Sequence, residues 1–439
     1  MEKVLIANRG EIAVRIIRAC RELGLSTVAV YSTADKDALH VKLADEAVCI
    51  GSASPIKSYL NIDNLLGAAQ ITGADAVQPG YGFLSENAEF AERCLKAGLT
   101  FIGPKPETIS LLGDKERARE TLKAVGVPVT PGSDGKITTL AEARTDAEKI
   151  GYPVMVKAVA GGGGKGMRLI QTPDQLEELF TLAQNEAAQA FGSNEMYLEK
   201  FIDRPRHIEV QVLGLKDGTG VAVGERDCSL QIHHQKVIEE APSSIDSATR
   251  DKMLSVSKRA VEELHYTGAG TLEFLYAGPN QFYFMEMNTR IQVEHPITEL
   301  TSGWDLVKAQ LLIADGKVPS AAPTANGYAI ECRINASSAG QITGLHLPGG
   351  NGIRVDTALY QGYKVPPNYD AMIAKIISYG PDRQTAVQKM LVAINETVIT
   401  GIETNLDFLN RLLRTNQFQQ NQFDIEFIER ELLPQSDSQ

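Results

Sequence analysis

Two glutamates in a β-rich stretch have the spacing expected of a metal site. Residues 268–288, GAGTLEFLYAGPNQFYFMEMN, contain two strand-like runs joined by a turn at 278–280. If the runs pair as a hairpin, Glu273 and Glu286 lie opposite each other or within one residue of that, with Cβ atoms roughly 5 Å apart. Two carboxylates so close repel unless a positive charge lies between them, and Mg²⁺ commonly binds through one or two carboxylates together with substrate phosphates. The pair therefore suits a site for a metal and ATP.

A line of polar side chains follows the second glutamate. Alternate residues of an extended strand share one face, and from position 286 onward these residues are Glu286, Asn288, Arg290, Gln292 and Glu294. The pattern alone fits either a solvated edge strand or a site that orients an anion, neutralises growing charge and removes a proton. The neighbouring carboxylate pair favours the second interpretation.

A glycine run, VKAVAGGGGKGM at 156–167, lies between two strand-like stretches. A Walker-type loop ends in lysine followed by Ser or Thr, whereas here Gly166 follows Lys165. The run also does not open a helix as a dinucleotide loop does. It fits a glycine hairpin over a nucleotide, with Lys157 reaching in from the strand before it, and equally a surface turn, because glycine permits both.

Other charged residues stand in or beside predicted strands and turns. Four of them are lysines: Lys115, Lys157, Lys200 and Lys236. A lone lysine is usually solvated, and Lys157 is the best exception because VMVKAVA surrounds it with apolar residues. Arg333, within YAIECRINA, is either at a sheet edge or functional. The tandem His233-His234 cannot point both rings one way from a strand, which argues against a zinc pair there.

The elements that must position these residues form an α/β pattern. Up to residue 80, short β-rich runs alternate with helical patterns, which predicts a parallel sheet with crossover helices, a Rossmann-like domain. Its first strand-to-helix turn, 8–11, has a single glycine, so nicotinamide binding is not expected. Further on, 207–215 and 221–229 flank the turn-like KDGTG and are expected to pair antiparallel. A helix over 247–264 then precedes the hairpin described above.

Composition limits the classes of function. The chain has 439 residues, 43% hydrophobic and 22% charged, as expected for a globular protein of two to three domains. Its net charge of −12 disfavours nucleic acid or an anionic membrane as the main partner. The five scattered cysteines show no zinc-type spacing and fit reduced thiols in a cytoplasmic protein. No run approaches the roughly 18 apolar residues of a membrane span.

With these residues in view, the chain resembles the ATP-grasp superfamily, and within it biotin carboxylase, over nearly its whole length. The matching stretches are IANRGEIA, QPGYGFLSEN, FIGP, GGGGKGM, ERDCSLQ, HQKV, QFYFMEMNTRIQVEHP and ECRINA. The resemblance implies a Rossmann-like pre-ATP-grasp domain over 1–112, an ATP-grasp region over 113–315 with a mobile lid at about 129–201, and a C-terminal biotin carboxylase domain over 316–439.

The reaction implied is carboxylation of biotin by bicarbonate with ATP, through carboxyphosphate, by a ligase. By resemblance, Glu273, Glu286 and Asn288 hold Mg²⁺ or Mn²⁺. The residues implied to contact phosphates are Lys115, Lys157 and His234, with Gly163 and Gly164 closing above them. Those implied to line the adenosine site are Glu199, Lys200, Ile202, His207, Gln231 and Leu275.

The resemblance also implies where the acceptor and the anion bind. Bicarbonate lies against Lys236, Arg290 and the backbone of Val293, with Gln292 in the same site and Glu294 as general base. Arg333 stabilises the negative charge that develops on the ureido oxygen of biotin.

Three stretches depart from the family pattern. Residues 231–236 read QIHHQK where the family usually has QRRHQK, so that two arginines are lost. In the glycine run, Lys165 replaces an arginine and Ala160 a glycine. After Ala336 a shorter SSAGQITG replaces the family's acidic, proline-containing loop, and this puts the biotin side of the site in question.

Several alternatives stay open at this point. Other ATP-grasp ligases share the fold and the metal pair, although the R-x-Q-x-E-H-P run favours biotin carboxylase. A catalytically silent ATP-binding regulatory subunit is a second possibility, and the front part of a multifunctional carboxylase a third. Because no M-K-M biotin loop is present, we expect biotin to arrive on a separate carrier protein, with transfer on carboxyltransferase subunits. The expected setting is a cytoplasmic, homodimeric subunit of acetyl-CoA carboxylase in fatty acid synthesis.

Overall fold

The structure is a computed structural model that describes residues 1–159, 166–319 and 326–433. It contains two compact units. The first comprises 1–127, 206–281 and 285–439, and the second comprises 128–205 with 282–284. No helix in the described ranges is long and apolar enough to span a membrane.

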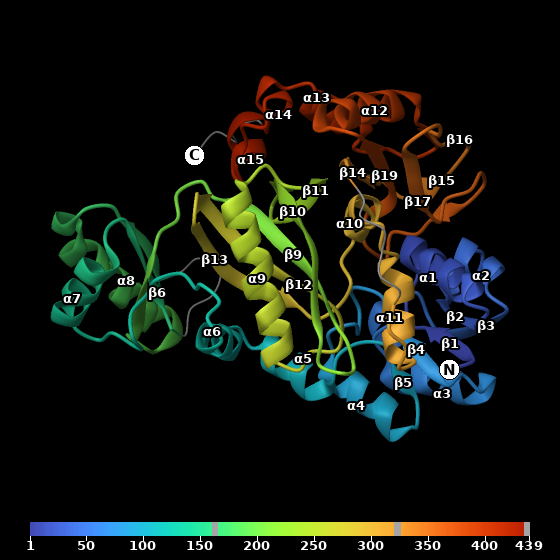
Figure 1. Cartoon of the computed structure of the whole chain (residues 1–439), viewed down its shortest axis with the longest axis horizontal. Coiled ribbons are helices and arrows are strands. Elements are labelled where there is room, and N and C mark those ends of the chain that lie inside the picture. Colours follow the sequence, from blue (N-terminus) through green and yellow to red (C-terminus); the bar gives the residue numbers. More distant parts are fainter. Residues whose placement is uncertain (160–165, 320–325, 434–439) are drawn as a thin grey trace. The chain divides into compact units, whose positions relative to one another are not determined.

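The first unit begins with the predicted parallel sheet, drawn in blue shades in Figure 1. Its strands lie in the order β3-β2-β1-β4-β5, and their bounds are β1 (Lys3–Ile6), β2 (Ser26–Ser32), β3 (Glu46–Gly51), β4 (Ala76–Gln78) and β5 (Thr100–Phe101). The accompanying helices are α1 (Gly10–Glu22), α2 (Leu39–Leu43), α3 (Ile62–Thr72), α4 (Ala88–Lys96), α5 (Pro106–Gly113) and α6 (Lys115–Ala124). In α1, Ile12, Ile16 and their neighbours form a helical stripe that is buried in the core.

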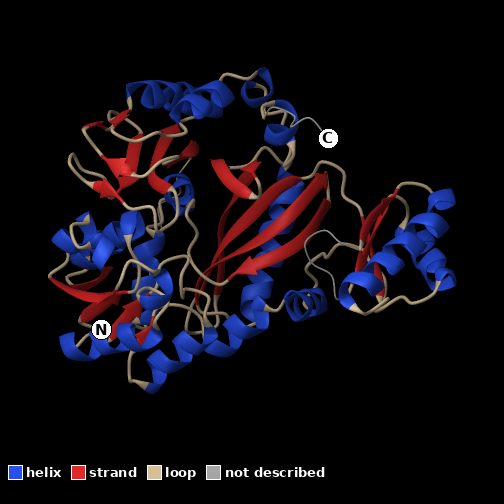
Figure 2. Cartoon of the chain, turned by 180° about the vertical axis from the view of Figure 1, so that it is seen from behind, coloured by secondary structure: helices blue, strands red, loops and turns tan. Residues whose placement is uncertain are grey.

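A second, larger sheet carries the candidate site and appears as the long red arrows of Figure 2. Its order is β13-β12-β9-β10-β11-β14-β19-β17. The strands are β9 (Arg206–Gly214), β10 (Gly220–Ile232), β11 (Gln235–Ala241), β12 (Gly268–Gly278), β13 (Gln281–Asn288), β14 (Tyr328–Asn335), β17 (Ile353–Thr357) and β19 (Met372–Gly380). As predicted, β9 pairs antiparallel with β10, and α9 (Ser247–Glu263) packs against both.

Alternation along β9 separates its two kinds of side chain. Ile208, Val210 and Val212 share one face, and His207, Glu209 and Gln211 share the other. All six are buried. A buried strand with one entirely polar face requires partners for each polar group, and those partners make up the site described below.

The rest of the first unit closes the far end of this sheet. The remaining short strands are β15 (Gly340–Gln341), β16 (Gly344–His346), β18 (Lys364–Val365) and β20 (Val398–Thr400). The helices are α10 (His295–Ser302), α11 (Leu306–Ala314), α12 (Arg383–Glu396), α13 (Leu406–Leu413), α14 (Asn416–Gln419) and α15 (Phe427–Glu431). Helix α12 packs on β14 and β19, and apolar residues of these elements form one core.

The second unit is a small α/β body with its own core. Its sheet has the order β7-β6-β8, with β6 (Val154–Ala158), β7 (Met167–Ile170) and β8 (Met196–Lys200), and its helices are α7 (Leu140–Ile150) and α8 (Leu176–Phe191). Strands β6 and β7 pair antiparallel, as the hairpin prediction requires. The glycine loop between them lies outside the described residues.

A buried histidine in α2 predicts how stability depends on pH. His40 is fully buried, and its Nε2 lies 3.2 Å from the carbonyl oxygen of Val30. Burial lowers the pKa of His40 from 6.5 to about 4. Between these pH values the unfolded chain binds a proton that the folded chain does not bind. The free energy of unfolding therefore falls as pH drops below 6.5, by about 1.4 kcal/mol per pH unit.

We expect His40→Gln, which keeps an N–H donor for Val30, to flatten this dependence. The measurement is urea unfolding at a series of pH values between 6.5 and 4. A slope equal to that of the wild type would show that other groups cause the acid instability.

Candidate active site

A pocket of about 450 Å³ opens in the first unit, over the polar face of the large sheet. It brings together most of the residues predicted from sequence: His207, Gln231, His234, Lys236, Glu273, Glu286, Asn288, Arg290, Gln292, Val293, Glu294 and Arg333. These come from strands β9 to β14 and from the segment before α10. The sheet thus brings residues more than a hundred positions apart in sequence together in one polar pocket.

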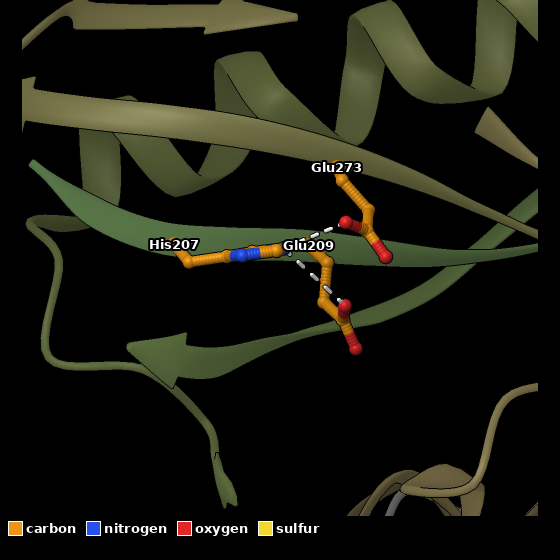
Figure 3. Close-up of side chains that lie close together, drawn as sticks. All are labelled: His207, Glu209 and Glu273. Carbon is orange, nitrogen blue, oxygen red and sulfur yellow. Dashed lines mark ion pairs between the residues drawn. The ribbon is translucent and has the colours of Figure 1, made fainter. Parts of the chain in front are cut away.

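Glu273 belongs to a buried group that sequence reasoning only partly identified. Figure 3 shows Glu273 beside His207 and Glu209, and the register pairs Glu273 on β12 with Glu209 on β9. His207 Nε2 lies 2.9 Å from Glu273 and 3.8 Å from Glu209. The three residues offer ligand atoms within 4.8 Å of one another. Sequence reasoning missed Glu209 because the stretch HIEVQVLGL does not reveal which residue pairs with a charge inside the strand.

Lys236 of β11 supplies the positive charge that these carboxylates require. Its Nζ lies 2.6 Å from Glu209, 2.6 Å from Glu294 and 3.3 Å from Glu273. Burial acts to lower the pKa of Lys236, but the surrounding acidic groups raise it well above its ordinary value. The ammonium group therefore stays charged and holds three carboxylates together.

Glu294 is the buried acid that faces the pocket at the start of α10. Burial alone raises its pKa, but Lys236, Arg333 and Arg226 overcome that effect and hold the pKa well below its ordinary value. Arg333 of β14 donates to Glu294 over 3.0 Å. The carboxylate is thus ionised and forms ion pairs with a lysine on one side and an arginine on the other.

Arg226 of β10 is a second residue that sequence reasoning missed. It is fully buried, and it donates to Glu209, Gln211, Thr271, Gln292 and Thr298. Gln292 accepts from Arg226 at 2.7 Å and donates to Glu273 at 2.5 Å. It therefore links the arginine to the carboxylate cluster. The stretch ERDCSLQ carried the only signal, a charged pair inside a strand.

The predicted alternation of one strand from 286 to 294 is wrong. Strand β13 ends at Asn288, and the chain then turns, so that Glu294 precedes the first residue of α10. The turn forms because Glu86 accepts from the backbone N–H of Thr289 at 2.9 Å and pairs with Arg290 at 2.8 Å. Strand β13 is an edge strand, as one interpretation held, but Asn288, Gln292 and Glu294 are buried and not solvated.

The two consecutive histidines lie in a turn and not on a strand. His233 and His234 join β10 to β11 with φ of 49° and 64°, the left-handed values of a two-residue hairpin turn. The strand argument against a zinc pair therefore does not apply. Both histidines are exposed, and His234 reaches the pocket lining.

The proposed metal ligands have a chemistry that fits Mg²⁺. Strands β12 and β13 are neighbours in the sheet, and Asn288 donates to Glu273 over 2.9 Å. Glu286 is half-exposed, and Lys115 Nζ lies 3.4 Å from its carboxylate. Two carboxylates and an amide oxygen in one pocket form the oxygen donor set that Mg²⁺ prefers.

Other predicted residues lie elsewhere. In the second unit, Lys157 forms an ion pair with Glu199, and Lys200 donates to the carbonyl oxygens of Gly151 and Tyr152 at 2.8 and 2.9 Å. Ile202 is half-buried just after β8. In the first unit, Leu275 is paired in register with His207. Gly163 and Gly164, with the substituted Ala160 and Lys165, lie outside the described residues.

The shortened segment after Ala336 does not fold into the pocket. Its Ser337 N–H donates to the carbonyl oxygen of Glu403 at 2.8 Å, and Gly340-Gln341 pairs with β18. Asn335, Asp370 and Met372 line the pocket on this side instead.

A parallel N-terminal sheet, a small α/β body in which β6 and β7 pair antiparallel, and a large antiparallel sheet bearing paired carboxylates define the ATP-grasp architecture. Comparisons with known proteins agree. Residues 1–109 match the family described as "Biotin carboxylase, N-terminal domain", 114–320 match "Carbamoyl-phosphate synthase L chain, ATP binding domain", and 331–430 match "Biotin carboxylase C-terminal domain".

Individual relatives are similar over their full length. A biotin carboxylase of Nostoc sp. is 52% identical over 440 residues, which cover 98% of each chain. The biotin carboxylase domain of a thermophilic 2-oxoglutarate carboxylase, solved with ADP, superposes with a TM-score of 0.93 at 45% identity, covering 98% of each chain. The corresponding domain of Hydrogenobacter thermophilus, a dimer solved with MgADP and bicarbonate, has a TM-score of 0.85 at 45% identity, covering 98% and 97% of the two chains.

The chain therefore belongs to the biotin carboxylase family of ATP-dependent carboxylases. This membership confirms the resemblance drawn from the motifs and decides against a different ATP-grasp ligase. The predicted boundaries near residues 112 and 315 stay predictions.

Proposed function

We propose that this chain carboxylates biotin carried on a separate protein, with bicarbonate and ATP as the other substrates and carboxybiotin, ADP and phosphate as products. The observation that carries the proposal is the grouping of Lys236, Glu294 and Arg333 in one pocket with the carboxylates of Glu273 and Glu286. A cation, a base and a guanidinium beside a metal-type donor set are what activation of bicarbonate requires.

The nucleotide is proposed to bind in two ways, through a metal ion held by the protein and through residues that contact its phosphates and adenosine directly. Bound Mg²⁺ or Mn²⁺ would neutralise the phosphates, held by Glu273, Glu286 and Asn288. Lys115, Lys157, His234, Gly163 and Gly164 contact the phosphates in this proposal. The residues assigned to adenosine are Glu199, Lys200, Ile202, His207, Gln231 and Leu275.

Bicarbonate is proposed to displace the internal ion pairs of the pocket. Lys236 and Arg290 are both held by carboxylates in the structure, Lys236 by Glu294 and Arg290 by Glu86. An anion bound against them and the backbone of Val293, near Gln292, takes over those contacts. Glu294 then loses one of its restraining cations, Lys236, and becomes a stronger base for the proton of bicarbonate.

Arg333 is proposed to face the biotin ureido oxygen as its charge develops. The partners in the cell would be a biotin carrier protein and carboxyltransferase subunits, as in acetyl-CoA carboxylase. A homodimer is proposed by analogy with the dimer of the H. thermophilus domain.

The first experiment is phosphate release by the purified protein with Mg·ATP, with and without bicarbonate and free biotin. Release that depends on bicarbonate and rises with biotin is the expected result. Binding of ATP without bicarbonate-dependent release would overturn the proposal and favour a silent nucleotide-binding subunit.

Replacing Arg333 with alanine should lower biotin carboxylation by about a hundredfold to a thousandfold, the effect of removing one oxyanion donor. The affinity for ATP, measured by calorimetry, should change only a few-fold. Arg383→Ala is the matched control, because Arg383 at the start of α12 pairs at 2.7 Å with buried Glu240 of β11 but does not line the pocket. Equal losses of carboxylation and ATP affinity in R333A would contradict the role assigned to Arg333.

A further inference from the structure

The guanidinium of Arg333 has a second acidic partner besides Glu294. Glu239 of β11 is fully buried, and its Oε1 accepts from Nε of Arg333 at 2.5 Å. The terminal nitrogen of Arg333 reaches Glu294 at 3.0 Å. Arg333 therefore spans two carboxylates, one in the pocket wall and one beneath it.

Glu239 stands in surroundings that disfavour its charge. The register of β11 and β14 pairs it directly with Glu331, which is also fully buried. Within the described part of the chain, Glu239 Oε2 and both oxygens of Glu331 have no hydrogen-bond partner. Two buried carboxylates side by side ionise together only at high cost. One cation, Arg333, thus binds the first of the pair, while the second is left without a donor.

We propose that Glu239 is a positioning residue for Arg333, and that uptake of a proton by Glu239 releases the guanidinium from the orientation that faces biotin. This inference rests on the proposed function, since it assigns Arg333 to the biotin-dependent step. Glu239 itself touches no substrate. Its ionised carboxylate contacts both Nε and the terminal Nη2 of Arg333, each at 2.5 Å, and so holds the guanidinium that lines the pocket.

The charge balance around Glu239 supports a response near neutral pH. The groups that face it are Arg333, Glu331 and Cys332 on β14, Glu294 before α10, Lys236 on β11 and Cys228 on β10. Burial raises the pKa of Glu239 to about 7, with Glu294 acting in the same direction and Arg333 and Lys236 against it. The pKa of Glu331 is raised well above its ordinary value by burial. Burial thus disfavours the charged form of both carboxylates, and for Glu239 the pKa lies near neutral pH.

The neighbouring residue on the same strand is a matched control. Glu240 is equally buried and pairs with an arginine, Arg383, at 2.7 Å, and it accepts from Tyr328. Alternation along β11 places it on the opposite face. Glu240→Gln therefore removes a buried ion pair of the same kind without touching Arg333.

The experiment compares wild type, E239Q and E240Q over about pH 6 to pH 8.5. Two rates are measured at each pH with saturating bicarbonate: phosphate release without biotin, and the increment caused by free biotin. The biotin-free rate corrects for the conversion of bicarbonate to CO₂, because both rates depend on the same anion. Thermal unfolding of each variant is recorded alongside.

In the wild type, the biotin-dependent increment should fall below about pH 7 more steeply than the biotin-free rate. In E239Q, which copies the protonated carboxyl, the increment should be about tenfold to a hundredfold lower at high pH, because a shift of order 1 Å in a positioned group costs about a hundredfold. It should also lose its acid limb, while E240Q keeps the wild-type profile.

Three outcomes would overturn the inference: an acid limb that persists in E239Q, one that is absent from the wild type, or an E240Q profile that matches E239Q. The wild-type comparison remains decisive if E239Q does not fold. Absence of any bicarbonate-dependent release in the wild type would instead contradict the proposed function, so the two failures are distinguishable.

Discussion

Replacing Lys236 with methionine is expected to abolish bicarbonate-dependent phosphate release and to lower the free energy of unfolding by about 3–5 kcal/mol. The loss of stability follows from what the ammonium leaves behind. Glu209, Glu273 and Glu294 all lie within 3.3 Å of Nζ, and none of the three is more than 5% exposed. Without the lysine their charges repel in a medium that cannot solvate them.

Methionine is the informative replacement because it fills the space of the lysine stem and removes only the charge and the donors. Urea unfolding of K236M measures the cost. Lys96→Met is the control, since Lys96 also pairs with a glutamate at 2.7 Å, but with 70% of its side chain exposed. That exposed pair should be worth less than about 1 kcal/mol. Equal stability losses in K236M and K96M would refute the argument from burial.

Protonation of one carboxylate should partly relieve the repulsion in K236M. The cation holds the pKa of Glu273 far below its ordinary value, and its removal lets one of the carboxylates take up a proton. K236M should therefore recover part of its lost stability as pH falls, because the folded variant binds a proton more tightly than the unfolded chain does. The wild type, whose Glu273 and Glu294 have lowered pKa values, should show the opposite slope.

The sequence predicted well those parts of the structure that depend on local pattern. The alternation of β runs and helical patterns before residue 80 led to the parallel sheet, and the hairpin between β12 and β13 followed from Gly278-Pro279-Asn280. These features depend on neighbouring residues, whose periodicity and turn chemistry are visible in a single chain.

The errors arose where a distant residue decides the local course of the chain. Periodicity predicted that the strand continues past Asn288. In the structure the strand ends there, because the backbone N–H of Thr289 donates to Glu86, which lies more than two hundred positions earlier in the sequence. The side chain of Lys375 likewise donates to the carbonyl oxygen of Val293 at 2.8 Å. No pattern within residues 286–294 contains either contact.

The same reason explains which site residues escaped notice. Glu209, Arg226 and Glu239 each stand inside a strand-like run, where a charge signals either an edge or a function. Their roles depend on strands that meet only in the folded sheet, β9 beside β12 and β11 beside β14. The motif resemblance supplied the groups implied to touch substrate, whereas the structure supplied the groups that hold them.

In the proposed mechanism, the ion pairs of the pocket keep the base inactive until substrates arrive. Lys236 and Arg333 both bind Glu294 directly, and together they hold its pKa well below the ordinary value. A carboxylate so stabilised is a weak base. Under this proposal, binding of an anion would draw the lysine away and raise the basicity of Glu294, so that proton removal is coupled to occupancy of the pocket.

Replacing Glu294 with glutamine should lower bicarbonate-dependent phosphate release by about a hundredfold to ten-thousandfold, the usual contribution of a general base. The amide keeps the shape of the side chain, and Lys236 retains Glu209 and Glu273, so ATP affinity should change only a few-fold. The matched control is Glu299→Gln in α10, the helix that Glu294 precedes, because Glu299 is buried between Arg15 and Arg354 and lies outside the pocket lining. If E294Q and E299Q lose activity equally, the loss reflects damaged packing. If E294Q keeps most of its activity, the proton of bicarbonate must leave by another group, and Glu294 serves only to orient Lys236 and Arg333.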